Sequence, residues 1–460
     1  MFKRYILIPV LFLFFLLFEL TFGYSGRMDH AELSPPDISF SPLDITNDLS
    51  GYHAYDNLDV SIDRFIKQWG VKGASVAVAK HGKLLYAKGF GFANEEEEEN
   101  MQPYHLLRIA SVSKLITAVA VMNLIEDGKL DLNDKVFGIK GILNAPQYLE
   151  YIDSRVEDIT VMQLLNHSGG WTSRWGDHLF MPGSIARQLG TELPIARNDI
   201  ISFALAKRLH FTPGLRSSYS NLGYLILESV IEKVSGRPYE KYVQSNVFRP
   251  LGINDAFLAY NFDDMRYPLE VRYYEVPDAS KVPAYDGKPE LVYKSRGGND
   301  IRTLGAAGGW VISSVSLMKF LSGIDMYSES TIISKRSIRT LESTKPGMQP
   351  LGWRRVAADG TKWRTGSFSG TSALTIMRSD GLTYVFITNT SPWVGARFPY
   401  EVNRMMTRAL STVNEWPNIN LFSIPSFTNN NYVEIKSELK ESSDNTGNLD
   451  WSIPSITNEG

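Results

Sequence analysis

The chain has 460 residues, and its 47 Lys and Arg against 50 Asp and Glu leave a formal net charge of −3 at pH 7. Hydrophobic residues make up 43% and charged residues 21%, which excludes a wholly disordered chain. The balanced charge argues against a nucleic-acid partner, and the absence of cysteine excludes disulfides, thiolate metal sites and a cysteine nucleophile.

The first 23 residues have the order of a secretory signal peptide. A basic start at Lys3 and Arg4 precedes an apolar run from Tyr5 to Phe18, and small residues follow. The run is shorter than the roughly 20 apolar residues that a membrane-spanning helix needs. We therefore expect residues 1–23 to be a cleaved leader of an exported protein, periplasmic or secreted, with an uncleaved membrane anchor as the alternative.

Two further stretches have a composition that disfavours a packed core. Residues 24–50 contain SPPD and SPLD, and residues 414–460 contain NNN, SSDN and TNEG without a strand or helix period. Such segments bury too little apolar surface to offset the entropy that is lost on ordering. We expect a lead-in at 24–50, one folded domain at 51–413, and a loosely docked or disordered tail at 414–460.

Strand patterns lie at the two ends of the folded part. Residues 74–94 alternate around a His81-Gly82 turn, and residues 372–390 form two apolar runs around Ser379-Asp380-Gly381. Each pattern predicts a β-hairpin. Because the two hairpins are about 280 residues apart, their strands are expected to meet in one sheet only through the tertiary fold.

Helix patterns fill the rest of the folded part. A helix is expected from Ser111 to a stop at Gly128, and another over residues 398–413. The middle, at about 129–299, is helix-like and loop-rich. The sequence thus predicts an α+β domain, with its α/β part at about 51–128 and 300–413 and a long helical insertion between them.

Ser111 and Lys114 form an S-x-x-K element at the start of the expected helix. Residues three apart share a helix face, so the Lys114 amine is expected over the Ser111 hydroxyl. The free N–H groups and positive dipole end of a helix N-terminus stabilise developing negative charge. A nucleophilic serine needs these features. The spacing by itself is weak evidence, because it recurs at 316/319 and 437/440.

Two more short elements complete the set of candidates. Tyr219 and Asn221 lie two apart on a turn before an apolar helix, where both could face a cleft as proton carrier and amide donor. Arg364-Thr365-Gly366-Ser367 lies in an expected strand, in which Gly366 would let a substrate backbone come close. Taken singly, each element is more often structural than catalytic.

The order Ser-x-x-Lys, Tyr-x-Asn and basic-Thr-Gly resembles the three-motif pattern of serine β-lactamases and penicillin-binding proteins. The resemblance extends over about residues 71–390 and includes LLNHSGGW at 164–171 and RTGSFSG at 364–370. Within that superfamily, the chain is most similar to the branch that contains class C β-lactamases, D-Ala-D-Ala carboxypeptidases, D-aminopeptidases and esterases. This implies a β-lactamase/transpeptidase-like fold, an antiparallel sheet flanked by helices with a large helical insertion.

The resemblance also implies roles for individual residues. Ser111 would be the acyl-forming nucleophile, Lys114 would assist its attack, and Tyr219 would be general base and then general acid. The substrate-binding residues would be Asn221, Arg364, Thr365, Gly366 and Ser367, and the backbone N–H groups of Ser111 and Ser367 would form the oxyanion hole.

Arg364 is the departure from the pattern, because relatives carry Lys or His at this position. Arg keeps the positive charge and can bind a carboxylate through two N–H groups, but it cannot carry a proton near neutral pH. Recognition of a substrate carboxylate by Arg364 is therefore expected, and the case for β-lactam hydrolysis is weaker.

The expected activity is that of a serine hydrolase acting on an amide or ester, first a peptidoglycan-type D-amino-acid peptide and second a small ester. The alternative is a catalytically weak member that binds cell-wall peptide or acts as a scaffold. No H-E-x-x-H motif or clustered acidic-histidine set is present, so no metal or other cofactor is expected. The loop at 171–183, with Trp171 and Phe180, either roofs the cleft or simply packs. The sequence leaves the oligomeric state open.

Overall fold

The computed structural model describes residues 45–328, 331–392 and 397–423. Contacts divide the chain into two units, Met1–Ser39 and Phe40–Gly460, and every described residue belongs to the second. The expected signal peptide, most of the lead-in and residues 424–460 of the expected tail lie outside the described residues. Among the helices that are described, none is both long and apolar enough to cross a membrane.

A seven-stranded antiparallel sheet joins strands from the two ends of the folded part, in the order β3-β2-β1-β12-β11-β10-β9. Ala77 lies opposite Val385 where the first hairpin meets the last. The expected α+β class, with strands from both ends of the domain in one sheet, is confirmed. The strands are β1 (Gly73–Lys80), β2 (Lys83–Asn94), β3 (Glu99–Asn100), β9 (Arg355–Val356), β10 (Lys362–Phe368), β11 (Thr371–Met377) and β12 (Leu382–Thr388).

Both predicted hairpins form, and their turns explain why. His81 and Gly82 have φ of 49° and 77°, as a two-residue hairpin turn with the twist of the strands requires. Gly381 has φ of 79°, and a Cβ there would lie 1.9 Å from Cδ2 of His81. The two turns therefore pack against each other, and only glycine fits at position 381.

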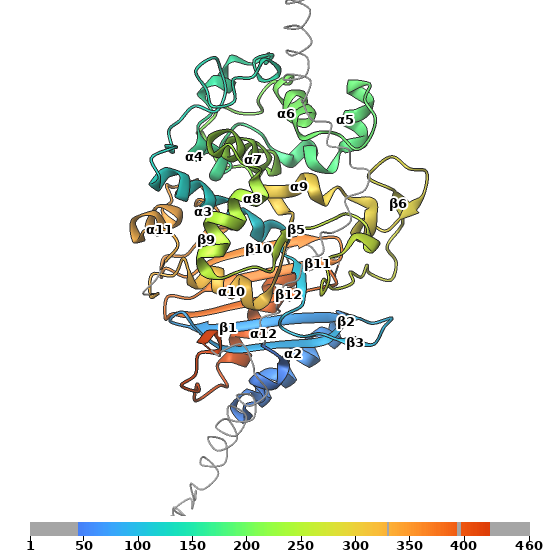
Figure 1. Cartoon of the computed structure of the whole chain (residues 1–460), viewed down its shortest axis with the longest axis vertical. Helices are drawn as coiled ribbons and strands as arrows, with labels where there is room; N and C mark the ends of the chain where they lie inside the picture. The colour runs from blue at the N-terminus through green and yellow to red at the C-terminus, as the bar shows by residue number, and fades with distance from the viewer. Residues whose placement is uncertain (1–44, 329–330, 393–396, 424–460) are drawn as a thin grey trace, which may run out of the picture. The chain divides into compact units, whose positions relative to one another are not determined.

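Helices cover both faces of the sheet (Figure 1). On one face, α2 (Asp56–Gln68) and α12 (Arg397–Leu410) pack against a core that includes Val76. On the other, α3 (Ser113–Glu126) and α10 (Ser314–Ser322) share a larger core with Ala77. Successive strand residues face opposite sides, so the neighbours Val76 and Ala77 enter different cores.

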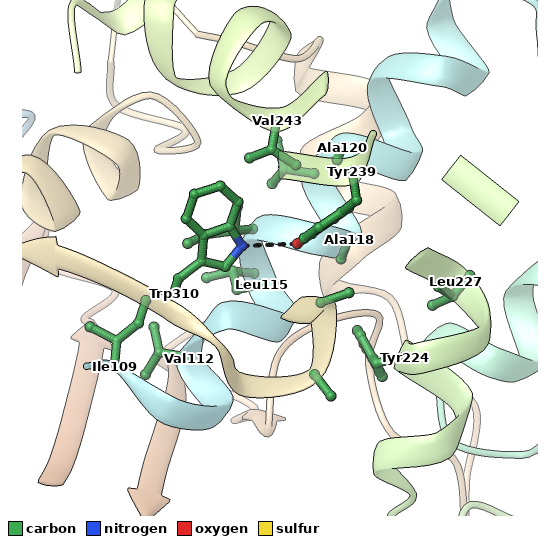
Figure 2. Packing of buried hydrophobic residues seen from close by; sticks show 14 of the residues in the cluster. Ile109, Val112, Leu115, Ala118, Ala120, Tyr224, Leu227, Tyr239, Val243 and Trp310 are labelled. Atoms are coloured by element: carbon green, nitrogen blue, oxygen red, sulfur yellow. Dashed lines mark hydrogen bonds between the residues drawn. The ribbon is translucent and has the colours of Figure 1, made fainter. Parts of the chain in front are cut away.

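The helix α3 is enclosed on nearly all sides, with Leu115, Ala118 and most of its other residues fully buried. A helix that is apolar all round belongs in the interior of a protein. Figure 2 shows Trp310 and Tyr239 beside these residues, joined by a hydrogen bond of 2.9 Å from the indole nitrogen to the phenol oxygen. This packing fixes the end of α3 at which the S-x-x-K element lies.

The middle of the chain is helical and loop-rich, as expected, but it also contributes a short strand. This strand, β5 (Ala256–Leu258), pairs with β8 (Trp310–Ser313), which also pairs with β4 (Leu106–Arg108). Three residues are too few to show a strand period, so the sequence did not reveal it. The remaining elements are α4 (Val161–Leu165), α5 (Pro182–Leu189), α6 (Arg197–Leu205), α7 (Asn221–Ser235), α8 (Tyr239–Val243), β6 (Val282–Pro283), β7 (Leu291–Val292), α9 (Ile301–Gly308) and α11 (Lys335–Glu342).

The folded part extends a few residues beyond the expected boundaries at both ends. Leu49, in the expected lead-in, is buried, and the side-chain oxygen of nearby Asn47 accepts a hydrogen bond of 2.7 Å from the backbone of Gly89. Leu421, in the expected tail, is buried as well, next to Asn420, whose side chain accepts from the backbone of strand β2 at 3.1 Å. Ile45 and Leu49 at one end and Leu421 at the other belong to the larger core, so apolar contacts together with hydrogen bonds dock both segments.

Candidate active site

Ser111 lies in a tight helical turn, Ala110–Val112, that runs directly into α3. Ala110 has φ of 46°, in the left-handed region that residues with a side chain rarely adopt. Its neighbours are buried, whereas Ser111 itself is only half-buried. The unusual backbone turns the serine towards the groups described next.

The side chains of Lys114 and Tyr219, from two motifs far apart in the sequence, meet at Ser111. Its Oγ lies 2.7 Å from the hydroxyl oxygen of Tyr219 and 3.2 Å from Nζ of Lys114. Lys114 also donates to Oδ1 of Asn221 at 2.7 Å and to the carbonyl of Ala307. The Lys114 side chain is fully buried, so its ammonium is held by these three acceptors.

The shared environment brings the pKa values of the lysine and the tyrosine close together. Burial lowers the pKa of Lys114 to about 8, with the Arg364 charge acting in the same direction and Tyr219 opposing it. Burial by itself would raise the pKa of Tyr219, but the charges of Lys114 and Arg364 outweigh it and lower that pKa to about 8. Either group can then exchange a proton near neutral pH, which unperturbed Lys and Tyr, with pKa values near 10, do poorly.

The local sequence around Tyr219 explains its position. The side chain of Ser220 accepts a hydrogen bond from the backbone of Gly223 at 3.4 Å and caps α7, so the helix begins at Asn221. Tyr219 stays in the extended segment before the cap and reaches Ser111, while Asn221 starts the first turn and reaches Lys114.

His167 supports this segment through its ring and one ring nitrogen. Its ring centroid lies 4.6 Å from that of Tyr219 and 5.2 Å from that of Tyr224. Its Nδ1 accepts from the backbone N–H of Ser220 at 3.3 Å, and burial keeps its pKa well below the usual value. A neutral imidazole therefore packs against the ring of Tyr219.

Strand β10 passes directly against the helical turn Ala110–Val112, which holds Ser111. A Cβ at Gly366 would lie 2.1 Å from the carbonyl oxygen of Ile109 and 3.0 Å from the amide nitrogen of Ser111, so only glycine fits. Ser367, the next residue, is exposed, and this close approach brings its backbone beside that of Ser111. The two segments that were expected to supply the oxyanion hole are thus adjacent.

Thr365 is on the wrong face of β10 for the expected substrate contact. It lies opposite Leu374, which belongs to the core under α2 and α12, and both line a cavity of about 590 Å³ with Trp363. Because strand side chains alternate, Arg364 and Gly366 face Ser111 and the Thr365 side chain points away.

The structure also contradicts the expectation that Arg364 binds a substrate carboxylate. Its side chain is only 1% exposed. Its Nε donates to the carbonyl oxygen of Ser111 at 2.8 Å and its Nη2 to the hydroxyl of Tyr219 at 3.4 Å. Two of the three guanidinium nitrogens therefore already have partners, while the buried Nη1 has no hydrogen-bond partner among the described residues. The charge of Arg364 acts on Tyr219 and lowers the pKa of its hydroxyl.

Two charged residues that the sequence did not single out border the site. Arg354 is exposed, and its guanidinium carbon lies 5.7 Å from the ring centroid of Tyr219. Asp177 accepts a hydrogen bond of 2.8 Å from Nδ2 of Asn221. Arg354 stands next to Arg355, and nothing local distinguishes the two, so only the fold reveals which one reaches the site.

The loop at 171–183 was expected either to cover the cleft or to pack in the core, and its two halves do one of these each. Trp171 is buried and packs in the core. Asp177 reaches Asn221, and the ring centroid of Phe180 lies 5.9 Å from that of Phe368 at the end of β10. The second half of the loop therefore borders the candidate site.

Among the described residues, the repeated S-x-x-K spacing does not form a second site. Ser316 of the repeated S-x-x-K spacing is fully buried, and its hydroxyl donates to the carboxylate of Asp255. The 437/440 pair lies outside the described residues. In the part of the chain that the structure describes, no group of three or more His, Cys, Asp or Glu side chains is arranged to hold a metal ion.

Curated relatives match parts of the chain. Protein flp of Staphylococcus aureus (strain NCTC 8325 / PS 47) is 27% identical over 208 residues, which are 45% of this chain and 38% of that protein. Esterase EstB of Burkholderia gladioli is 30% identical over 249 residues, which are 51% of this chain and 56% of that protein. The chain thus spans between about a third and somewhat over half of the length of these relatives.

Solved structures match a larger part of the chain. A penicillin-binding protein homologue from Pyrococcus abyssi, described as octameric, has a TM-score of 0.58 and 26% identity and covers 79% of both chains. D-amino acid amidase from Ochrobactrum anthropi SV3 has a TM-score of 0.60 and 20% identity, covers 78% of this chain and 98% of that one, and supports the fold alone. The family model described as Beta-lactamase matches residues 58–402, most of the chain. The chain belongs to the β-lactamase family and has its fold.

Proposed function

We propose that this protein is a serine hydrolase that cleaves an amide or ester through an acyl-enzyme on Ser111. The observation that carries the proposal is the hydrogen bond of 2.7 Å between the hydroxyls of Ser111 and Tyr219, with Lys114 3.2 Å from the same serine oxygen. A nucleophilic serine needs a proton acceptor within reach whose pKa is near the working pH. Tyr219, with a pKa lowered to about 8 by its two cationic neighbours, meets both conditions.

In the proposed reaction, the phenolate of Tyr219 takes the proton of Ser111 as its Oγ bonds to the substrate carbonyl carbon. The negative charge on the carbonyl oxygen is met by the backbone N–H groups of Ser111 and Ser367. Tyr219 then returns the proton to the leaving amine or alcohol as the carbonyl carbon–leaving group bond breaks. In the second half, Tyr219 takes a proton from the water molecule that attacks the acyl carbon. It gives this proton to Oγ of Ser111 as the acyl–serine bond breaks and the acid product leaves. Loss of one oxyanion donor typically costs about 10²–10³ in kcat.

The two buried cations have one role in this scheme. Lys114 stays next to the phenolate, and Arg364 is permanently charged, 3.4 Å from the tyrosine oxygen. Together they favour the ionised form of Tyr219 in a site where burial disfavours it. An arginine in the third motif is therefore compatible with catalysis although it cannot carry a proton.

For the substrate, we propose a D-amino-acid peptide with a free carboxylate first and a small ester second. The name of one relative, an esterase, is compatible with cleavage of an ester bond. Arg354 is the exposed guanidinium at the site, and no side chain among the described residues forms an ion pair with it. It takes over the carboxylate contact that the buried Arg364 cannot make, because a free guanidinium binds a carboxylate through two parallel hydrogen bonds.

The alternative of a catalytically weak binding protein is tested by covalent labelling with a fluorophosphonate. We expect one label per chain, lost in Ser111→Ala and retained in Ser316→Ala, which removes the other described S-x-x-K serine. A Ser111→Ala protein that is folded and still labelled would refute Ser111 as the nucleophile. No label and no turnover in the folded wild-type protein would favour the binding role.

A further inference from the structure

The carboxylate of Asp177 borders the catalytic groups. Asp177 lies in the loop that roofs part of the site, between two short helical turns (Ser173–Trp175 and His178–Phe180). Its Oδ2 accepts from the side-chain amide of Asn221 at 2.8 Å, and its Oδ1 accepts from the backbone N–H of Leu179 at 3.1 Å. The side chain is only half-buried, so it is fixed by two donors and still partly open to what enters the site.

The charge of Asp177 is not neutralised by a bonded cation. Within the described ranges no lysine, arginine or histidine forms an ion pair with it, and neighbouring His178 has its pKa lowered by burial. The ammonium of Lys114 is already held by Ser111, Asn221 and Ala307. The negative charge of the Asp177 carboxylate therefore has no bonded cationic partner among the described residues.

We propose that Asp177 binds a protonated amine of the substrate close to the scissile carbonyl, so that the enzyme prefers aminoacyl amides and esters with a free amino group. This inference rests on the proposed hydrolase function. Asn221, which is expected to hold the carbonyl of the substrate, is bonded to Asp177, so an amine next to that carbonyl falls near the carboxylate. A carboxylate has about four acceptor positions, of which Asn221 and Leu179 occupy two, and an ammonium has three donors to fill the rest.

The residues around Asp177 indicate which side chain the substrate carries next to its amine. Phe180, three residues after Asp177, is 46% exposed and contacts Phe368 of β10 at 5.9 Å between ring centroids. An apolar side chain on the carbon that carries the amine would meet these two rings. Phenylalanine amide is therefore a suitable probe, and 3-phenylpropanamide is the same molecule without the amine.

The test compares kcat/KM for D- and L-phenylalanine amide and for 3-phenylpropanamide in the wild type and in Asp177→Asn. A charge-assisted hydrogen bond accounts for about a 10- to 100-fold difference in affinity. We expect a loss of this size for the better amine substrate, mainly in KM, and a change below about threefold for 3-phenylpropanamide. Glu192→Gln, which removes an exposed carboxylate from a neighbouring loop, is the charge-matched control and should leave both unchanged.

Equal losses on the two substrates would overturn the inference and make Asp177 a positioning residue for Asn221. A loss on neither would overturn it as well.

A binding experiment separates this inference from the proposed function. Calorimetry on Ser111→Ala measures the affinity for phenylalanine amide and for 3-phenylpropanamide without turnover. We expect the amine to increase affinity about 10- to 100-fold, and adding Asp177→Asn to abolish that gain. If the wild type is inactive and unlabelled but this gain is present, the hydrolase proposal fails and the amine site stands. If the amine brings no gain, the amine site fails whatever the activity.

Discussion

Replacing Tyr219 with phenylalanine removes one oxygen atom from the centre of the candidate site. That oxygen lies 2.7 Å from Oγ of Ser111 and 3.4 Å from Nη2 of Arg364. The ring keeps its contact with His167, at 4.6 Å between centroids. Because the volume of the side chain is nearly conserved, the substitution tests the hydroxyl and not the packing.

We expect kcat/KM of Tyr219→Phe to fall by about 10²–10⁴-fold, the range for loss of a general acid–base group. This corresponds to about 3–5 kcal/mol of transition-state stabilisation. The buried guanidinium of Arg364 loses one acceptor, which should cost about 1–3 kcal/mol of stability. For a domain of this size the fall in Tm is a few degrees, so the variant stays folded at 25 °C and the two effects can be measured separately.

The pH dependence gives a second readout. Tyr219 acts as a base only when it is ionised, so kcat/KM of the wild type should rise with pH up to the pKa of Tyr219, about 8. The residual activity of Tyr219→Phe should lack this rise, because the titrating group is gone. A purely structural role of the tyrosine would lower activity without changing the shape of the profile.

Tyr224→Phe is the matched control. It removes a second buried phenol oxygen beside the same histidine, one that donates to the carbonyl of Leu165 at 2.8 Å. We expect a loss of Tm comparable to that of Tyr219→Phe with activity within about threefold of the wild type. Activity is followed with a chromogenic ester, and Tm by calorimetry. Unchanged turnover and an unchanged profile in Tyr219→Phe would refute Tyr219 as the base.

Three other predictions follow from the same geometry. Arg354→Ala should lower kcat/KM by about 10- to 100-fold for a peptide with a free carboxylate but not for its C-terminal amide, whereas Arg355→Ala should affect neither; equal losses on both substrates would contradict the role of Arg354. Gly366→Ala should destabilise the protein by about 1–3 kcal/mol and nearly abolish turnover, because its Cβ would lie 2.1 Å from the carbonyl of Ile109; calorimetry and the ester assay check this, and a fully active variant would exclude a tight strand–turn contact. We propose export by residues 1–23, so mass spectrometry of the secreted or periplasmic protein should find a start between about Tyr24 and Arg27; an intact Met1 on membrane-bound material would favour an anchor.

Local features of the chain were readable without the structure. The hairpins at 74–94 and 372–390 follow from alternating apolar residues around turn residues, and both formed as predicted. The helix after Ser111 ends at Glu126, two residues before the predicted stop at Gly128. The three-residue spacing of Ser111 and Lys114 likewise allowed their contact to be anticipated. In each case the residues that decide the outcome are a few positions apart, and short-range sterics and periodicity act at that distance.

The environment of charged side chains was decided only by the tertiary structure. Arg364 and Arg354 have the same chemistry and lie ten residues apart, yet the first is 1% exposed behind Tyr219 and the second is exposed at the site. Asp177 becomes a neighbour of Asn221 across 44 positions, through a loop without a regular pattern. Whether such a group is buried, paired or open to a substrate depends on packing between segments far apart in the chain, and neither spacing nor composition contains that information.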